Sequence, residues 1–219
     1  QSLILHFDRV KVQLMDNKQL NLIPFHDTYF LITTSVFSKL GTGFFENDEN
    51  MTSFVLSFAK FYFDALNQYF KGESVAAAWQ FMFNQCERNL LPRFVYLLLG
   101  VHAHINQDLS LCVRALDFGV AFRNDYLAIN QIIKGKLAEA IAQLNEKSIV
   151  LKRILQNGLF LYQMPMHQII VLCRNLAWLK SQVVGIAEND IGAGGAHAFR
   201  LHRLDRRRGA HRHEGGRAN

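Results

Sequence analysis

Residues 100–109 read GVHAHINQDL and place two histidines, an asparagine and an aspartate directly after an apolar run. His104 and Asp108 are four residues apart, so on a helix their side chains lie one turn apart on the same face. An imidazole beside a carboxylate can transfer protons in catalysis, and the same pair can supply two ligands to a divalent metal ion. We therefore take His104 and Asp108 as candidate catalytic residues and as candidate metal ligands.

The same stretch holds a second pair with the same spacing, His102 and Asn106. The two pairs lie about 200° apart around a helix, so one pair faces the interior and the other faces a neighbour or solvent. The more apolar stripe of this helix contains the first pair. We expect His104 and Asp108 to be the buried pair.

A buried histidine–aspartate pair also has a purely structural interpretation. Burying a carboxylate is costly unless it has a partner, and an imidazole on the same helix supplies one, so the pair can simply knit helices together. A metal site instead needs further ligands from other helices. We expect Asp125 to be the third metal ligand, and the other candidates are His26, Asp27, Asp64 and His167.

The elements that would position these residues are helices, because apolar residues recur at helical spacing almost throughout the chain. The three prolines, at positions 24, 92 and 165, each stand where a helix can begin. The pattern predicts an all-α fold, a single compact bundle of about eight helices. We expect these helices at residues 3–15, 24–41, 51–71, 75–89, 92–109, 125–145, 148–163 and 165–181. Residues 51–71 are apolar on more than one face, which predicts a helix in the centre of the bundle.

Composition changes abruptly near residue 190. Residues 191–219 are rich in Gly, Ala, Arg and His, contain no lysine, and carry seven arginines against one aspartate and one glutamate, or +5 of the net charge of +6. We expect a helical domain at 1–190 and, at 191–219, a tail that is disordered or a sequence artefact. The domain itself is nearly neutral, so we expect no binding of nucleic acid through it.

Hydropathy and cysteine spacing indicate a soluble protein. No stretch reaches about 18 uninterrupted apolar residues, so we expect no transmembrane segment. The three widely spaced cysteines give no even disulfide framework, which fits a reducing compartment. We expect a cytoplasmic or otherwise soluble protein, and a chain that begins at Gln1 is also compatible with a signal peptide that has been removed.

The stretch GVHAHINQDLSL resembles the signature GxNAHINxDLxL of a mainly bacterial family of uncharacterised proteins, domain of unknown function 5995. Four more segments are similar to parts of that family: FHDTYFLITTSVF, FAKFYFDAL, DYLAINQII and CRNLAW. His102 stands where the family pattern has asparagine. The resemblance implies a helical domain and brings no established activity with it.

The matching positions add candidate residues to the site. Besides His104 and Asp108, we expect a ligand to be bound by Tyr29, Tyr62, Asn106, Asn130 and Arg174. Asn130 falls on an apolar helical face and therefore needs a hydrogen-bond partner. Arg174 is expected to lie over the indole of Trp178, four residues on, or to pair with Asp108. Asp125 has a second interpretation, as an acid in the first turn of a helix.

The sequence carries no GxSxG, Walker, HExxH or CxxC motif that would name an enzyme class. Two functional hypotheses therefore remain open. The first is a helical domain that binds a small molecule or a divalent metal, with a metal-dependent hydrolase resembling phospholipase C or a nuclease as its alternative. The second is a non-enzymatic interaction or scaffold domain whose polar cluster fixes the register of the helices. The sequence leaves open whether the protein is an enzyme, what it binds and how it assembles.

Overall fold

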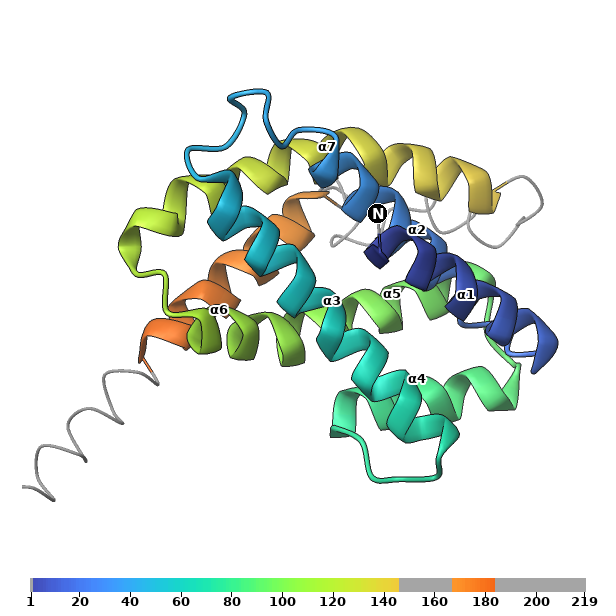
Figure 1. Ribbon diagram of the computed structural model, residues 1–219. Helices are drawn as coiled ribbons and strands as arrows, with labels where there is room; N and C mark the ends of the chain where they lie inside the picture. The colour runs from blue at the N-terminus through green and yellow to red at the C-terminus, as the bar shows by residue number, and fades with distance from the viewer. Residues whose placement is uncertain (1, 146–166, 184–219) are drawn as a thin grey trace, which may run out of the picture. The chain divides into compact units, whose positions relative to one another are not determined.

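The computed structural model describes residues 2–145 and 167–183, and within these ranges the regular structure is helical (Figure 1). The α-helices are α1 (Ser2–Asp16), α2 (Ile23–Phe37), α3 (Asp48–Phe70), α4 (Ala77–Arg88), α5 (Arg93–Ala103), α6 (Ser110–Leu116), α7 (Arg123–Asn145) and a helix at residues 167–183. A π-helical turn, His104–Leu109, joins α5 to α6, and a 3-10 turn, Val120–Phe122, precedes α7. The predicted all-α fold class is confirmed.

Seven of the eight predicted helices coincide with these elements, several to within one or two residues. The predicted helix at 148–163 and the predicted tail at 191–219 lie outside the described residues. By its contacts the chain divides into a unit of residues 1–178 and a second unit from residue 179 onward. All the site residues discussed below belong to the first unit.

Local sequence explains where several helices begin and end. Pro24 stands in the first turn of α2 and Pro92 directly before α5, where the missing N–H of proline leaves no hydrogen bond unmade. Asn47 caps α3, because its side-chain oxygen accepts a hydrogen bond from the backbone N–H of Asn50 at 2.8 Å. Asn89 ends α4 in the left-handed conformation at φ 51°. The predictions made from Pro24 and Pro92 are confirmed, and Pro165 lies outside the described residues.

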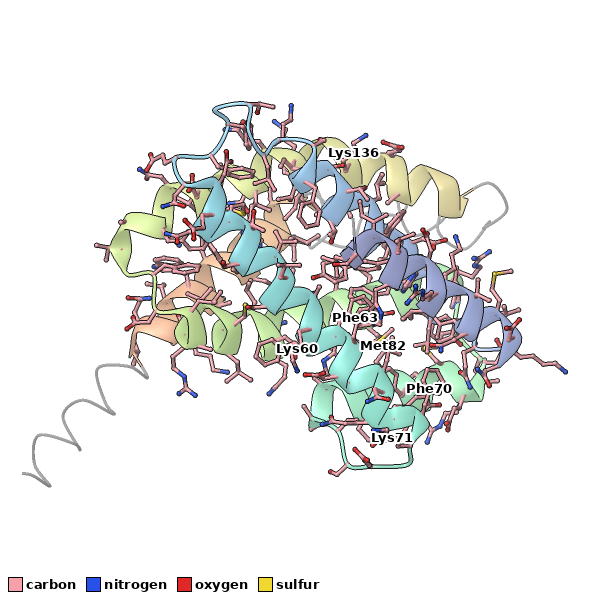
Figure 2. All side chains as sticks on the ribbon, viewed as in Figure 1. Lys60, Phe63, Phe70, Lys71, Met82 and Lys136 are labelled. Carbon is pink, nitrogen blue, oxygen red and sulfur yellow. The ribbon has the colours of Figure 1, made fainter. Side chains whose placement is uncertain are left out.

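The core of the first unit forms where α2 and α3 meet their neighbours. Helix α2 packs against α1, α5 and α7, and α3 packs against α4, α6 and the π-turn. Helix α3 buries much of one side, with Met51, Phe54, Phe58, Ala59, Tyr62 and Leu66 among its covered residues. Its other side faces solvent, since Leu56 and Phe70 are more than two-fifths exposed, and Lys60 lies on the surface (Figure 2). The predicted central helix is therefore amphipathic, with only part of its apolar surface in the core.

A close contact at Gly100 sets how near α5 lies to α2. A Cβ atom built on Gly100 would lie 2.3 Å from the ring carbon Cγ of Phe25, well inside van der Waals contact. Only a residue without a side chain permits this approach. The glycine of the GVHAHINQDL stretch thus brings α2 against the start of the π-turn, where the candidate residues lie.

The two buried cysteines in the first unit are core residues. Burial raises the pKa of Cys86 and Cys112 to about 12, so both stay protonated at neutral pH. A protonated buried thiol is a weak nucleophile. We therefore treat Cys86 and Cys112 as packing residues.

No helix in the described ranges combines the length and the apolar character needed to cross a membrane.

Candidate functional site

The segment HINQDL adopts a π-helical turn between α5 and α6, a rare geometry that is frequent at functional sites. His104 and Asp108 are each 3% exposed, and Nδ1 of His104 lies 2.9 Å from Oδ2 of Asp108. The second pair lies on the exposed side, where Asn106 Nδ2 is 2.9 Å from His102 Nδ1. The prediction that His104 and Asp108 form the buried pair is confirmed.

Trp79, on α4, completes the surroundings of the carboxylate. Its indole N–H donates to both oxygens of Asp108, at N–O distances of 3.1 and 3.0 Å. An indole nitrogen can only donate, so Asp108 acts as the acceptor in this contact. Sequence reasoning missed Trp79, although a buried indole N–H needs an acceptor and a buried aspartate is a suitable one. Asp108 is thereby held by two donors from two different helical segments.

The protonation state of His104 follows from its surroundings. Burial lowers the pKa of His104, and the neighbouring Asp108 opposes this shift only in part. The imidazole is therefore neutral at neutral pH, with one N–H and one lone pair. The hydrogen-bond pattern places the proton on Nδ1, which donates to Asp108, and leaves the lone pair on Nε2. Among the described residues, Nε2 is buried and has no hydrogen-bond partner.

Aromatic rings hold the imidazole of His104 in place. Phe58 stacks on it with ring centroids 3.7 Å apart and planes within 13°. Tyr29 meets it edge-on at 4.4 Å, and Phe25 lies at 5.7 Å in a similar orientation. Because Nδ1 is tied to Asp108 and one face is covered by Phe58, rotation of the ring would break packing and a hydrogen bond together. The direction of Nε2 is fixed.

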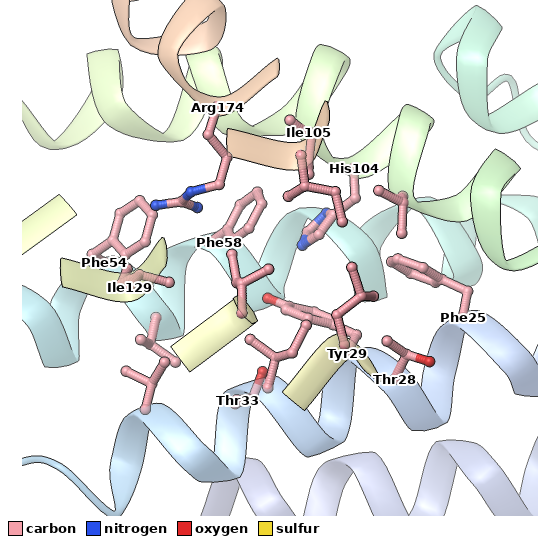
Figure 3. Close-up of a pocket in the computed structure, with 17 residues that line it drawn as sticks. Phe25, Thr28, Tyr29, Thr33, Phe54, Phe58, His104, Ile105, Ile129 and Arg174 are labelled. Carbon is pink, nitrogen blue, oxygen red and sulfur yellow. The ribbon is translucent and has the colours of Figure 1, made fainter. Parts of the chain in front are cut away.

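His104 borders a cavity of about 80 Å³ between α2, α3, α5, α7 and the helix at residues 167–183. Figure 3 shows the imidazole of His104 reaching in beside Phe58 and Tyr29, with Arg174 farther along the wall. The lining is almost wholly apolar, and it includes Ile32, Val36, Val55, Val101, Ile105, Ile129, Ile133, Leu137 and Ile170. The unpartnered nitrogen thus belongs to a side chain in the wall of an apolar space.

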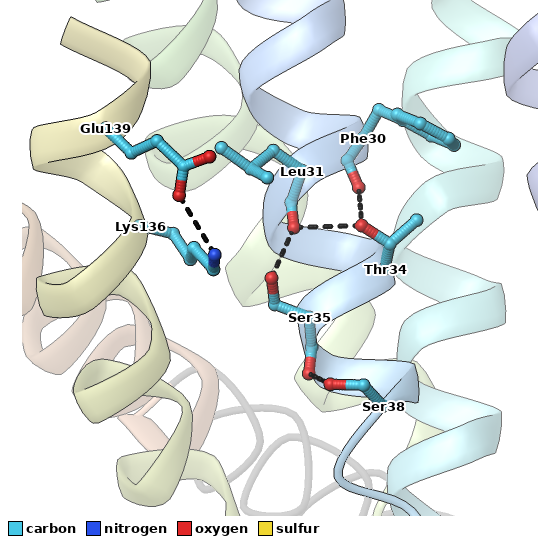
Figure 4. Close-up of polar contacts among 7 residues, drawn as sticks. All are labelled: Phe30, Leu31, Thr34, Ser35, Ser38, Lys136 and Glu139. Carbon is cyan, nitrogen blue, oxygen red and sulfur yellow. Dashed lines mark hydrogen bonds and ion pairs between the residues drawn. The ribbon is translucent and has the colours of Figure 1, made fainter. Parts of the chain in front are cut away.

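Most hydroxyl groups on α2 donate hydrogen bonds to backbone carbonyls of the same helix. Thr28 donates to the carbonyl of Pro24 at 2.8 Å, and Thr34 and Ser35 donate to carbonyls one turn back in the same way (Figure 4). Burial raises the pKa of Tyr29, whose hydroxyl hydrogen-bonds with Thr33 and keeps its proton. His104 is therefore the polar group of the wall with a nitrogen still to be satisfied.

Arg174 joins two helices rather than pairing with Asp108. Its Nε donates to Asn130 Oδ1 and its Nη2 to the carbonyl of Tyr126, both at 2.8 Å, while its guanidinium lies 4.3 Å from the ring centroid of Tyr126. The cation over Trp178 is Arg123, at 4.9 Å. The expected positions of Arg174 were wrong. The carboxylate of Asp108 accepts its hydrogen bonds from Trp79 and His104 instead. The expected partner of Asn130 is confirmed as Arg174.

The other predicted residues are placed apart from the cavity. Tyr62 bonds to His26, with its hydroxyl 3.0 Å from Nδ1, and Asn106 belongs to the outer pair with His102. Asp125, in the first turn of α7, accepts hydrogen bonds from the backbone N–H groups of Glu46 and Asn47 at 2.6 and 2.9 Å. Asp125 is thus an acid in the first turn of α7 that fixes the loop before α3 by accepting hydrogen bonds from its backbone.

The three predicted metal ligands do not lie together in the structure. Within residues 2–145 and 167–183, no group of three or more His, Cys, Asp or Glu side chains is arranged to hold a metal ion. His104 and Asp108 are together, but Asp125 does not join them, because both of its oxygens are taken by backbone N–H groups. Of the additional candidates, Asp27 pairs with Lys11 and Asp64 with Lys60.

Comparison with protein families gives one match, to the family described as "Family of unknown function (DUF5995)", over residues 2–209. Neither the curated proteins nor the solved structures include a match.

Proposed function

The chain belongs to the DUF5995 family, whose function is unknown, and we propose from its own side chains that it binds a small, largely apolar molecule in the cavity beside His104. The observation that carries this proposal is a buried imidazole that lines an apolar space and whose Nε2 has no partner among the described residues. A buried polar atom without a partner costs about 1–3 kcal/mol. A bound molecule can recover that cost.

The volume of the cavity limits the size of its occupant. About 80 Å³ is roughly half of the 150 Å³ cavity that holds benzene in an engineered protein. Pockets for drugs and cofactors are larger, about 300–1,000 Å³. In this conformation the cavity therefore takes a molecule smaller than benzene and excludes a large planar cofactor.

Filling the cavity also stabilises the fold. An enclosed apolar cavity costs about 24 cal/mol for each Å³, so about 2 kcal/mol is the upper limit for this partly open space of about 80 Å³. A ligand that restores the missing packing contacts gains part of this amount in addition to any hydrogen bond.

The alternatives have less support from the same residues. A scaffold domain whose polar cluster only fixes helix register needs neither a cavity beside the cluster nor an unpartnered nitrogen. A metal-dependent hydrolase needs ligands besides His104 and Asp108, and the described residues contribute no third ligand to the pair. Binding of a small molecule uses both the nitrogen and the space.

Titration with furan, a five-membered ring smaller than benzene, tests the proposal. We expect furan to raise the melting temperature and to shift the methyl NMR signals of Ile105 and Ile129, which line the cavity. Ile133→Phe places a ring where Ile133 lines the cavity and should abolish binding. Ile132→Phe is the matched control, because Ile132 is buried on the same helix without lining the cavity. If furan leaves the wild-type methyl signals unchanged, the proposal is wrong.

A further inference from the structure

We propose that the molecule bound in the cavity is a neutral hydrogen-bond donor, such as a small alcohol or an N–H heterocycle, which donates to Nε2 of His104. This inference rests on the proposed binding function and adds the chemical class of the ligand. It is carried by the geometry around His104, which determines both the direction and the hydrogen-bonding role of Nε2.

Three contacts in sequence impose that role. Trp79 donates to both oxygens of Asp108, so the carboxylate is left to accept from His104. Nδ1 of His104 therefore carries the proton, and Nε2 of the neutral ring can only accept. The hydrogen bond from Nδ1 to Asp108 fixes the orientation of the ring, because a flip would turn Cδ2–H toward the carboxylate, and stacking on Phe58 at 3.7 Å holds the plane of the ring. The chain thus presents an acceptor of fixed direction to the cavity.

The surroundings favour a neutral donor over a charged one. An anion has no hydrogen to donate to Nε2, and two of the N–H groups of Arg174, at the cavity wall, donate to Asn130 and Tyr126. An ammonium ion could donate, but it would lose its hydration in an almost wholly apolar space. A neutral donor gains the hydrogen bond without that penalty.

The surroundings also favour an organic molecule over water. A buried water molecule typically makes about three hydrogen bonds. In the cavity wall, the Thr28 hydroxyl donates to the carbonyl of Pro24 and the Tyr29 hydroxyl is hydrogen-bonded with Thr33, so the wall provides few further partners. A molecule with one donor and an apolar body matches one acceptor in an apolar wall.

Pyrrole and furan form a matched pair of probes, because both are five-membered aromatic rings and only pyrrole has an N–H to donate. We expect pyrrole to bind the wild-type protein about tenfold more tightly than furan, which corresponds to about 1.4 kcal/mol. His104→Phe should remove this preference while furan still binds. His102→Gln, in the exposed pair of the same segment, should leave it unchanged.

A measurement on the wild-type protein keeps the test valid if His104→Phe does not fold. In protein labelled with ¹⁵N at histidine, pyrrole should shift the Nε2 resonance of His104 in the direction of an accepted hydrogen bond, and furan should not. Equal affinity for the two probes overturns the inference while leaving the proposed function in place. An Nε2 resonance that is already hydrogen-bonded in buffer and unchanged by pyrrole also overturns it, because water then fills the role. If neither probe binds, the proposed function itself fails.

Discussion

A second buried histidine, His26 on α2, should make the fold sensitive to mild acid. Its Nε2 lies 3.1 Å from the carbonyl of Phe7, which can only accept, so Nε2 carries the proton. Its Nδ1 then accepts from the hydroxyl of Tyr62 at 3.0 Å. His26 in its neutral form therefore ties α1, α2 and α3 together. A second proton would have to sit on Nδ1, so the buried Tyr62 hydroxyl could no longer donate to it and would lose its acceptor.

The size of the effect follows from the pKa. Burial lowers the pKa of His26 from 6.5 to about 4, although Asp27 opposes the shift. Between these two values the unfolded chain takes up a proton and the folded chain does not, so acid favours unfolding. Stability from this residue is complete above pH 6.5 and is lost as the pH falls toward 4. Between pH 7.5 and 4.5 the loss amounts to about 2–3 kcal/mol.

Urea denaturation at pH 7.5 and 4.5 measures this contribution when the wild type is compared with His26→Gln. Glutamine can donate to Phe7 and accept from Tyr62 but does not titrate, so the variant should lose about 2–3 kcal/mol less between the two pH values than the wild type. His6→Gln, at an exposed position on α1, is the control and should follow the wild type. Other titrating groups are common to all three proteins and cancel in the comparison. Parallel losses for the wild type and His26→Gln would refute the reasoning.

Two more substitutions test how the site is positioned. Gly100→Ala should destabilise the protein by about 1–3 kcal/mol, because the new Cβ would overlap the ring of Phe25. Gly135→Ala, on α7 with open space around it, should stabilise the protein by about 0.5–1 kcal/mol. Urea denaturation of both variants measures the difference. Trp79→Phe should cost about 1.5–3 kcal/mol, because the Asp108 carboxylate loses a charge-assisted hydrogen bond, and an unchanged unfolding free energy would show that the indole contact contributes nothing.

The sequence predicts well what lies on one helical element. The pairing of His104 with Asp108 and the burial of that pair follow from a spacing of four residues and from one apolar stripe. Contacts between elements are harder to predict, because spacing along the chain says nothing about which helices meet. Trp79 is 29 residues from Asp108 in sequence, and no local pattern links them. The misplacement of Arg174 has the same origin, since its real partners, Asn130 and Tyr126, lie on another helix.

The π-turn explains why helical periodicity alone could not reveal the geometry of the site. In a π-turn each N–H bonds five residues back instead of four, so one extra residue enters the turn and the faces of the flanking helices shift relative to each other. Residues before the turn, such as Leu97, and residues after it, such as Cys112, are nevertheless both buried. The inserted residue thus lets α5 and α6 face the core while His104 and Asp108 stay paired between them. Within this turn the chain keeps a polar pair inside an apolar core, with His104 in the wall of the cavity.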